Sequence, residues 1–216
     1  MHMPKADRAH PTRKAEQSRE TQDRLIKAAK ELFTTKGYAD TAMEDLVAKA
    51  GMTRGALYHQ YADKRDLFRA VFEAVVAELG QQLAMAVGAE TDPWQMLRAG
   101  ARAFLASATE PGIRRIVLVD GPAVLGWEEW RRIDAQHSLG MVRMIFEANI
   151  AAGNIPPQPV EPLAHLIVGA LNEAALAVAA AGDAAGARES FASSMEGVLD
   201  ALRAMATATP KRAAHQ

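Results

Sequence analysis

Cysteine is absent from this chain of 216 residues. Its absence excludes disulfide scaffolds, thiolate metal sites and thiol nucleophiles, and it is consistent with a reducing cytoplasm. The first 20 residues are polar and charged, so they lack the apolar segment of a signal peptide. A run of about 18 uncharged apolar residues is also missing, and we expect no membrane span.

Motifs of common enzyme classes are lacking too. The chain has no G-x-S-x-G, no H-E-x-x-H and no glycine-rich phosphate loop. Glu128 and Glu129 are adjacent and would point in different directions on a helix, which is poor geometry for paired carboxylates. The six histidines never stand four residues apart, so a metal sensor would need histidines that converge from separate helices. We therefore expect no enzyme, no cofactor and no metal site.

Charge is unevenly distributed along the chain. Residues 1–65 contain 13 Lys and Arg against 9 Asp and Glu, a balance of +4, whereas the totals of 25 and 26 leave 12 against 17, or −5, for the remainder. A basic N-terminal third joined to an acidic body suggests an anionic partner at the N-terminal end.

Helical periodicity runs through almost the whole sequence. We expect helices over residues 25–33, 42–50, 54–60, 64–86, 93–108, 128–151, 160–181 and 184–207. Gly37, Gly51 and Gly153 stand at helix ends, Thr41 with Glu44 forms a capping-box pattern, and Thr53, Asp63 and Asp92 are further expected caps. Residues 113–119 (IRRIVLV) could form a strand but have no partner strand, and residues 120–127 are expected as an irregular turn. The predicted fold is all-α.

The stretch TRGALYHQY, residues 53–61, has little core-forming character. It follows a short helix and the turn Ala50-Gly51-Met52-Thr53, which together form a helix-turn-helix arrangement. Leu57 would pack against Leu46, Val47 and Ala50, so the other faces of the short helix would remain outside. A helix presented in this way fits the major groove of DNA.

Each polar or small residue around this helix has an expected role at DNA. Arg54 suits bidentate hydrogen bonds to guanine, and small residues at positions 55 and 56 allow a close approach. Hydroxyl, imidazole and ammonium groups nearby suit phosphates. The expected DNA-binding residues are Thr41, Thr53, Arg54, Gly55, Ala56, Tyr58, His59, Tyr61 and Lys64. Purely structural roles compete for some of them: Thr41 and Thr53 as caps only, Tyr61 in the core, and Lys64 as a surface lysine.

Residues 41–68, TAMEDLVAKAGMTRGALYHQYADKRDLF, resemble the N-terminal domain of TetR-type transcriptional regulators. The matching positions are Thr41, Leu46, Ala50, Gly51, Met52, Thr53, Gly55, Leu57, Tyr58, Tyr61, Lys64 and Leu67. Tyr61 departs from the usual phenylalanine, and Glu44 stands where some members place a base-contacting basic residue.

This resemblance implies a homodimer with an N-terminal three-helix bundle carrying the helix-turn-helix and a larger C-terminal helical ligand-binding and dimerisation domain. We divide the chain into a flexible arm (1–17), a DNA-binding domain (18–65), an effector-binding and dimerisation domain (66–208) and a flexible tail (209–216). The last two helices are expected to pair with their copies, and LIVGALNEAALAVAAA is apolar on nearly every face, which also favours burial on two sides.

A mostly apolar pocket with a few polar groups would suit an effector. Tryptophan, aspartate, histidine and methionine recur at helical spacing after residue 126, and the residues expected to bind the ligand are Phe104, Asp120, Trp127, Trp130, Arg131, Asp134, His137, Met141, His165 and Asn172. The same pattern also suits an ordinary core. The sequence thus predicts a cytoplasmic regulator, a repressor by resemblance, that leaves a palindromic operator when a small molecule binds. A ligand-independent DNA-binding protein is the alternative.

Overall fold

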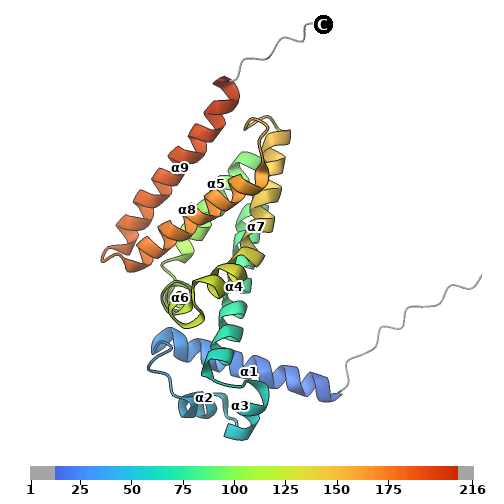
Figure 1. Ribbon diagram of the computed structural model, residues 1–216, viewed down its shortest axis with the longest axis vertical. Helices are drawn as coiled ribbons and strands as arrows, with labels where there is room; N and C mark the ends of the chain where they lie inside the picture. Colours follow the sequence, from blue (N-terminus) through green and yellow to red (C-terminus); the bar gives the residue numbers. More distant parts are fainter. Residues whose placement is uncertain (1–12, 209–216) are drawn as a thin grey trace, which may run out of the picture.

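The computed structural model describes residues 13–208, with side chains from residue 18 to residue 206. Over this range every regular element is a helix, as expected (Figure 1). The elements are α1 (Arg13–Thr35), α2 (Met43–Ala50), α3 (Arg54–Gln60), α4 (Lys64–Gly88), α5 (Pro93–Ser107), the π-helix η1 (Ile113–Asp120), α6 (Gly121–Leu125), α7 (Trp127–Ala151), α8 (Val160–Ala180) and α9 (Ala184–Ala208).

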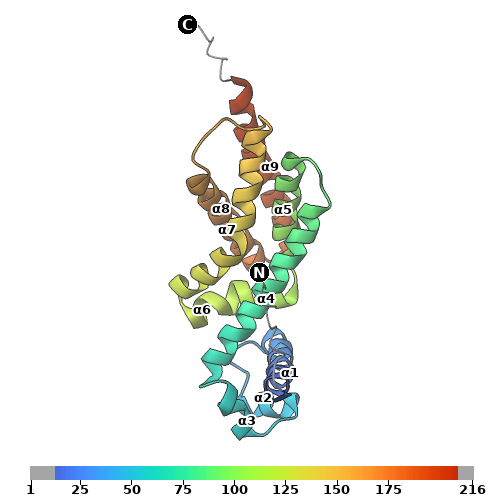
Figure 2. The same cartoon turned by 90° about the vertical axis from the view of Figure 1, so that its right-hand side faces the viewer.

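The molecule has a small foot and a larger body. Helices α1, α2 and α3 form the foot, and α4 runs from the foot into the body (Figures 1 and 2). There α5 and α7 pack against α4, and α8 and α9 pack on the other side of α5 and α7. One hydrophobic cluster spans the foot and the lower body, from Leu25 and Phe33 through Phe68 to Trp130. A second cluster fills the upper body around Trp94 and Phe146.

Helix starts follow the local signals at three of the four expected caps. The side chains of Thr53, Asp63 and Asp92 accept hydrogen bonds from backbone N–H groups in the first turns of α3, α4 and α5. These bonds satisfy donors that the helix leaves unpaired.

The expected capping box of Thr41 and Glu44 is wrong. The residue at the start of α2 is Ala42, which makes no side-chain cap. The Thr41 hydroxyl donates instead to the carbonyl of Gly37, 2.7 Å away, and its side chain is buried. The loop folds back on the end of α1, so Thr41 closes that loop rather than starting α2.

Gly51 makes the turn between α2 and α3. Its φ of 62° lies in the left-handed region, and its N–H bonds the carbonyl of Ala48. Only glycine enters this region without a steric cost from Cβ. Leu46 and Leu57 on either side of the turn are fully buried in the same cluster, so the turn and the core together fix α3.

The segment between α5 and α7 differs from the sequence prediction. Residues 113–120 form a π-helix, and residues 121–125, expected as an irregular turn, form the short helix α6. A π-helix is rare and is frequent at functional sites. Here it lies where the body meets the foot, and it contacts α1, α4 and α8.

Two helices are long and apolar enough to cross a membrane. Helices α4 and α8 contain 18-residue windows with mean hydropathy 1.3 and 1.7, although no membrane span was expected from the sequence. Both are core helices of the body, with 39% and 56% of those windows buried, and such helices pass the same test. They are weak evidence for a membrane.

Candidate functional site

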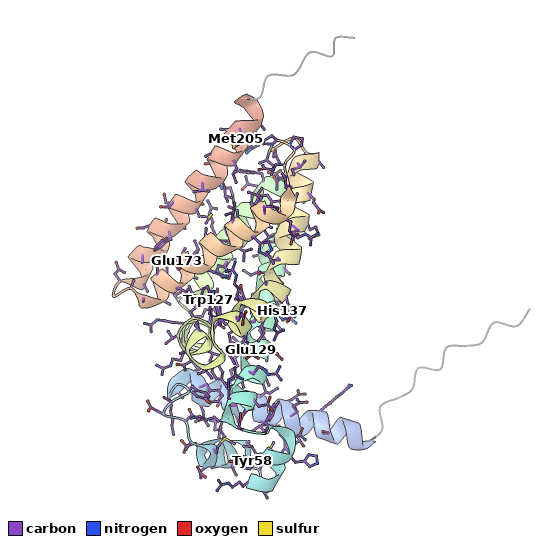
Figure 3. The ribbon with its side chains drawn as sticks, in the orientation of Figure 1. Tyr58, Trp127, Glu129, His137, Glu173 and Met205 are labelled. Carbon is purple, nitrogen blue, oxygen red and sulfur yellow. The ribbon has the colours of Figure 1, made fainter. Side chains whose placement is uncertain are left out.

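The exposed surface of α3 forms the tip of the foot. Thr53, Arg54, Gly55, Tyr58 and His59 are exposed there. Figure 3 shows Tyr58 at this end, far from Met205 at the other end of the molecule. Leu57, fully buried, anchors the opposite side of the helix, and Ala56 is half-buried. The short helix therefore presents its polar side outward, as the sequence predicts.

Arg54 stands at the first position of α3 and is 67% exposed. Its Nη1 lies 3.3 Å from Oε1 of Glu44, and its guanidinium carbon lies 5.7 Å from the ring centre of Tyr58. Contact with Tyr58, and then the charge of Glu44, raise the pKa of Arg54 further above its ordinary value. The guanidinium is thus charged, oriented by two neighbours and accessible.

Tyr61 and Thr41, two of the expected DNA-binding residues, lie inside the foot. Tyr61 is 5% exposed, and its hydroxyl accepts a hydrogen bond from Nε2 of Gln22 on α1. Thr41 is 1% exposed. Their side chains do not share the surface of α3, and the structural alternative stated for Tyr61 describes its position.

Lys64 is the third expected DNA-binding residue that lies away from that surface. Its side chain stabilises the loop between α1 and α2. Its ammonium donates to the carbonyls of Tyr38 (2.8 Å), Thr41 (3.0 Å) and Ala39 (3.4 Å). It also lies 4.3 Å from the ring centre of Tyr38. An ammonium has three N–H donors, and these three carbonyls engage all of them.

A cavity of about 50 Å³ lies in the body, between α4, α5, α7, α8 and α9. Its lining is almost wholly apolar, and Ser138 and Asn172 are its polar side chains. A smaller void of about 10 Å³ adjoins it and shares Phe104 and Asn172 with it. The smaller void reaches Asp134, Trp130 and the inner side of η1.

Asp134 and Asn172 make the polar end of these two voids. They come from α7 and α8, and Nδ2 of Asn172 donates to Oδ2 of Asp134 at 2.7 Å. Their side chains are 6% and 4% exposed. Burial raises the pKa of Asp134, while the bond from Asn172 and the charges of Arg131 and His137 act against that rise.

The structure brings only part of the expected ligand site together. Phe104, Met141 and Asn172 line the larger void, and Phe104, Trp130, Asp134 and Asn172 line the smaller one. The rest of the expected set lines neither void: Asp120, Trp127, Arg131, His137 and His165.

Those five residues lie at the surface or where the body meets the foot. Trp127 is 54% exposed and stacks on Trp130 with ring centres 4.9 Å apart, so α7 does not present its aromatic and polar residues on one inward face as expected. His137, also labelled in Figure 3, is exposed, and His165 lies 3.4 Å from Glu161. In the part of the chain from residue 13 to residue 208, no group of three or more His, Asp or Glu side chains could hold a metal.

Asp120 links the body to the foot. Its Oδ2 accepts from the backbone N–H of Tyr38 (2.8 Å) and from Nε of Arg115 (3.1 Å). The Arg115 guanidinium lies over Gly37, where a Cβ would come within 1.8 Å of it. The φ of Gly37 is 84°, in the left-handed region. Glycine therefore permits both this backbone conformation and the close approach of Arg115.

Arg65 makes a second link across the same junction. It donates to the carbonyls of Val124 (3.2 Å) and Leu125 (3.0 Å) in α6 and to Glu129 (2.7 Å). Sequence reasoning missed both links because the partners are up to 82 residues apart. It also missed the apolar cavity walls, such as Val87, Leu97 and Val168, which carry no signal that separates them from ordinary core.

Comparison with known proteins covers both parts of the chain. Residues 25–71 match the family described as bacterial regulatory proteins, tetR family. Residues 94–202 match a second family, described as tetracyclin repressor-like, C-terminal domain. The first match spans the helix-turn-helix, and the second spans α8, most of α9 and the cavity walls that follow α4.

Individual relatives agree with these matches. The crystal structure of a TetR-family transcriptional regulator from Pectobacterium atrosepticum is 35% identical, covers 89% of this chain and 97% of its own, and superposes with a TM-score of 0.79. The TetC protein of transposon Tn10 from Escherichia coli is 23% identical over 154 residues, 71% of this chain and 78% of that protein. The regulator AcrR of Shigella flexneri is 31% identical over 84 residues, 38% of this chain and 39% of AcrR.

The exposed recognition helix, the all-helical body and these similarities lead to one conclusion: the chain belongs to the TetR family of DNA-binding transcriptional regulators.

Proposed function

We propose that this protein is a dimeric repressor that binds a palindromic operator through α3 and is released when a small molecule enters the body. The observation that carries the proposal is the surface of α3. A buried leucine anchors this helix, while an accessible arginine, a glycine, a tyrosine and a histidine face outward. We assign DNA contact to Thr53, Arg54, Gly55, Ala56, Tyr58 and His59. Repression rather than activation follows the usual action of the family.

The dimer interface is assigned to α8 and α9. On α9, Phe191, Val198 and Met205 recur every seven residues and are 36%, 50% and 52% exposed. Leu166 on α8 is 70% exposed. A seven-residue repeat of apolar side chains on a helix suits packing against another helix, and α9 forms an outer edge of the body (Figure 1). A second copy of the chain is the natural partner.

Release from DNA is assigned to η1. Its inner residues Ile113, Val117 and Leu118 line the smaller void, and its last residue, Asp120, holds the Tyr38 amide in the foot. A ligand that displaces η1 would therefore disturb the foot. For thermodynamic coupling, the ligand must bind the DNA-incompetent arrangement better, and DNA must weaken the ligand equally.

The domain division follows from the same assignments. Residues 18–65 form the DNA-binding unit and residues 66–208 the effector-binding and dimerisation unit, with α4 connecting them. A regulator that binds the chromosome of a bacterium acts in the cytoplasm.

The first experiment selects bound sequences from a random duplex library at about 0.15 M salt. A dimer should enrich a palindrome whose half-sites are about one helical turn, 34–36 Å, apart. Binding that never enriches a sequence and disappears as salt rises would refute sequence-specific recognition.

Arg54→Ala tests the assignment of α3 on the selected operator. Loss of a bidentate base contact should weaken operator binding by about 10- to 100-fold and relax the preference at one base position. Fluorescence anisotropy with the operator and with random DNA measures both effects. Arg132→Ala, an exposed arginine on α7, is the matched control and should bind the operator as the wild type does. An equal loss on operator and random DNA would assign Arg54 to a phosphate instead.

A further inference from the structure

The two voids of the body have different linings. Phe104 and Asn172 border both of them, so the voids are neighbours. The larger void is lined by apolar side chains such as Leu83, Val87, Leu97 and Leu199. The smaller void reaches Asp134. A ligand that fills both voids needs an apolar part and one polar end.

The polar end is built from side chains that are more than nine-tenths buried. Asp134 is 6% exposed and Asn172 is 4% exposed. Among the described residues, Asn172 is the one side chain that donates a hydrogen bond to the Asp134 carboxylate. A carboxylate can accept about four hydrogen bonds, so Asp134, which lines the smaller void, keeps spare acceptor capacity beside Asn172.

Within the described part of the chain, no cationic side chain lines the smaller void. The cationic or titratable groups that act on Asp134 are Arg131 and His137, and both lie exposed on the outer part of α7. The other residues that line the smaller void, from α4, α5, η1 and α8, carry no charge. A buried carboxylate without a cation is costly unless it becomes protonated or acquires a partner.

We propose that the effector is a lipophilic amine whose protonated nitrogen pairs with Asp134 while its apolar part fills the space between α4, α5, α7, α8 and α9. This inference rests on the proposed function, because it names the ligand of the same body cavity. The ammonium supplies both the charge and the N–H donors that the Asp134 carboxylate lacks. Asn172 holds the carboxylate in place for it.

Ligands of other charge fit this end less well. A carboxylic acid would place a second negative charge beside Asp134, which is repulsive at close range. A neutral alcohol can donate one hydrogen bond, but it leaves the carboxylate charge unpaired. The apolar walls alone would not distinguish these three ligands.

Ligand binding must also enlarge the space. An engineered protein cavity of about 150 Å³ accepts benzene, whereas the larger void here is about 50 Å³. An aryl-alkyl amine therefore has to displace side chains or helices on entry. The smaller void is bounded by η1, so part of this displacement falls on the element that holds Tyr38.

Three probes with the same apolar part test the ligand class: phenylbutylamine, phenylbutanol and phenylbutyrate. Calorimetric titration of the full-length dimer should give the amine an affinity about 10-fold or more above that of the alcohol, with the acid weakest. Asp134→Asn keeps the shape of the side chain and removes its charge, and it should reduce the amine to the affinity of the alcohol. Unchanged alcohol binding by this variant shows that the cavity is intact.

Asp23→Asn, on the exposed face of α1, is the control for general attraction of a cation to an acidic surface, and it should bind the amine as the wild type does. The inference is overturned if the alcohol or acid binds as tightly as the amine, if Asp134→Asn leaves amine binding unchanged, or if none of the probes binds at millimolar concentration.

Operator binding, measured separately by anisotropy, distinguishes the two proposals. Operator recognition without amine binding refutes only the ligand class. Amine binding without operator recognition refutes the regulator function. Amine binding that fails to weaken operator binding refutes the effector role.

Discussion

Lys64 shows how a single residue connects the elements of the foot. Its ammonium joins the start of α4 to the loop between α1 and α2 through the carbonyls of Tyr38, Ala39 and Thr41. The same loop carries the Tyr38 amide that Asp120 holds from the body. Lys64 therefore supports the loop on which the junction depends.

Lys64→Ala should destabilise the protein without changing the number of phosphates it contacts. Three carbonyls lose a charged donor, which costs about 1–3 kcal/mol of unfolding free energy. Urea denaturation measures this loss, and the salt dependence of DNA binding should keep its slope. Lys27→Ala, an exposed lysine on α1, is the stability control. A flatter salt slope with unchanged stability would instead support the expected phosphate contact of Lys64.

Asp134 determines a dependence of stability on pH. Burial raises the pKa of Asp134 above its ordinary value of 3.8, so the folded chain holds this proton more tightly than the unfolded chain does. Stability is therefore lost as pH rises from 3.8 through the raised pKa, and it stays lower above that pKa. The amide of the Asp134→Asn variant does not titrate, so this variant should not lose stability over that pH range.

We expect Asp134→Asn to melt at a higher temperature than the wild type at neutral pH, with an advantage that shrinks as the pH falls through the raised pKa of Asp134 toward 3.8. Thermal unfolding across this range measures the difference. An advantage that grows toward acid pH would contradict the sign of the shift.

At the scale of elements, α3 is a seven-residue helix that is too short to be stable by itself. Thr53 caps it, Leu57 anchors it in the core and Gly51 sets its direction. Because packing holds the helix, its outer positions are available for recognition. Gly55 is one of them, and a Cβ added there would meet nothing within 4 Å in the free protein.

Gly55→Ala should therefore act in opposite directions on folding and on DNA binding. Alanine favours a helix over glycine by up to about 1 kcal/mol, so the free protein should become slightly more stable. The added methyl group should weaken operator binding if the backbone approaches the groove closely. Gly140→Ala, also helical with no atom near its Cβ, should give only the stability gain. Unchanged operator affinity in Gly55→Ala would show that α3 does not approach DNA at this position.

At the scale of the whole molecule, the proposed recognition of a palindromic operator requires two copies of the chain. Two α3 helices must contact successive half-sites, so their separation is set by how the bodies pair. The apolar repeat on α9 and Leu166 on α8 mark the side of the body where that pairing is assigned (Figure 1). Anything that separates the subunits removes the second recognition helix.

Val198→Glu should turn the dimer into a monomer, because it places a charge in the middle of the apolar repeat. Size-exclusion chromatography with light scattering measures the mass, and operator affinity should fall with it. Met85→Glu adds the same charge at another exposed apolar position, on α4, and should remain dimeric. A dimeric Val198→Glu protein that still binds the operator would place the interface elsewhere.

The helices and the recognition surface were accessible from the sequence because their signals are local. Capping by Thr53, Asp63 and Asp92 and the left-handed Gly51 act within about one helical turn. The alternation of Leu57 with polar neighbours likewise marks which side of α3 is outside. These short-range features predicted most helix bounds to within two residues and the outward-facing polar side chains of α3, but they missed η1, α6 and the start of α1 at Arg13.

Only the tertiary structure decided which polar residues are buried and what surrounds them. Thr41, Tyr61 and Lys64 have the same chemistry as exposed neighbours, but the folded loop and α1 engage them. Asp134 meets Asn172 across 38 residues, and Tyr38 meets Asp120 across 82. Local sequence carries no information on such contacts, because they arise when distant helices pack together and exclude water from the space between them.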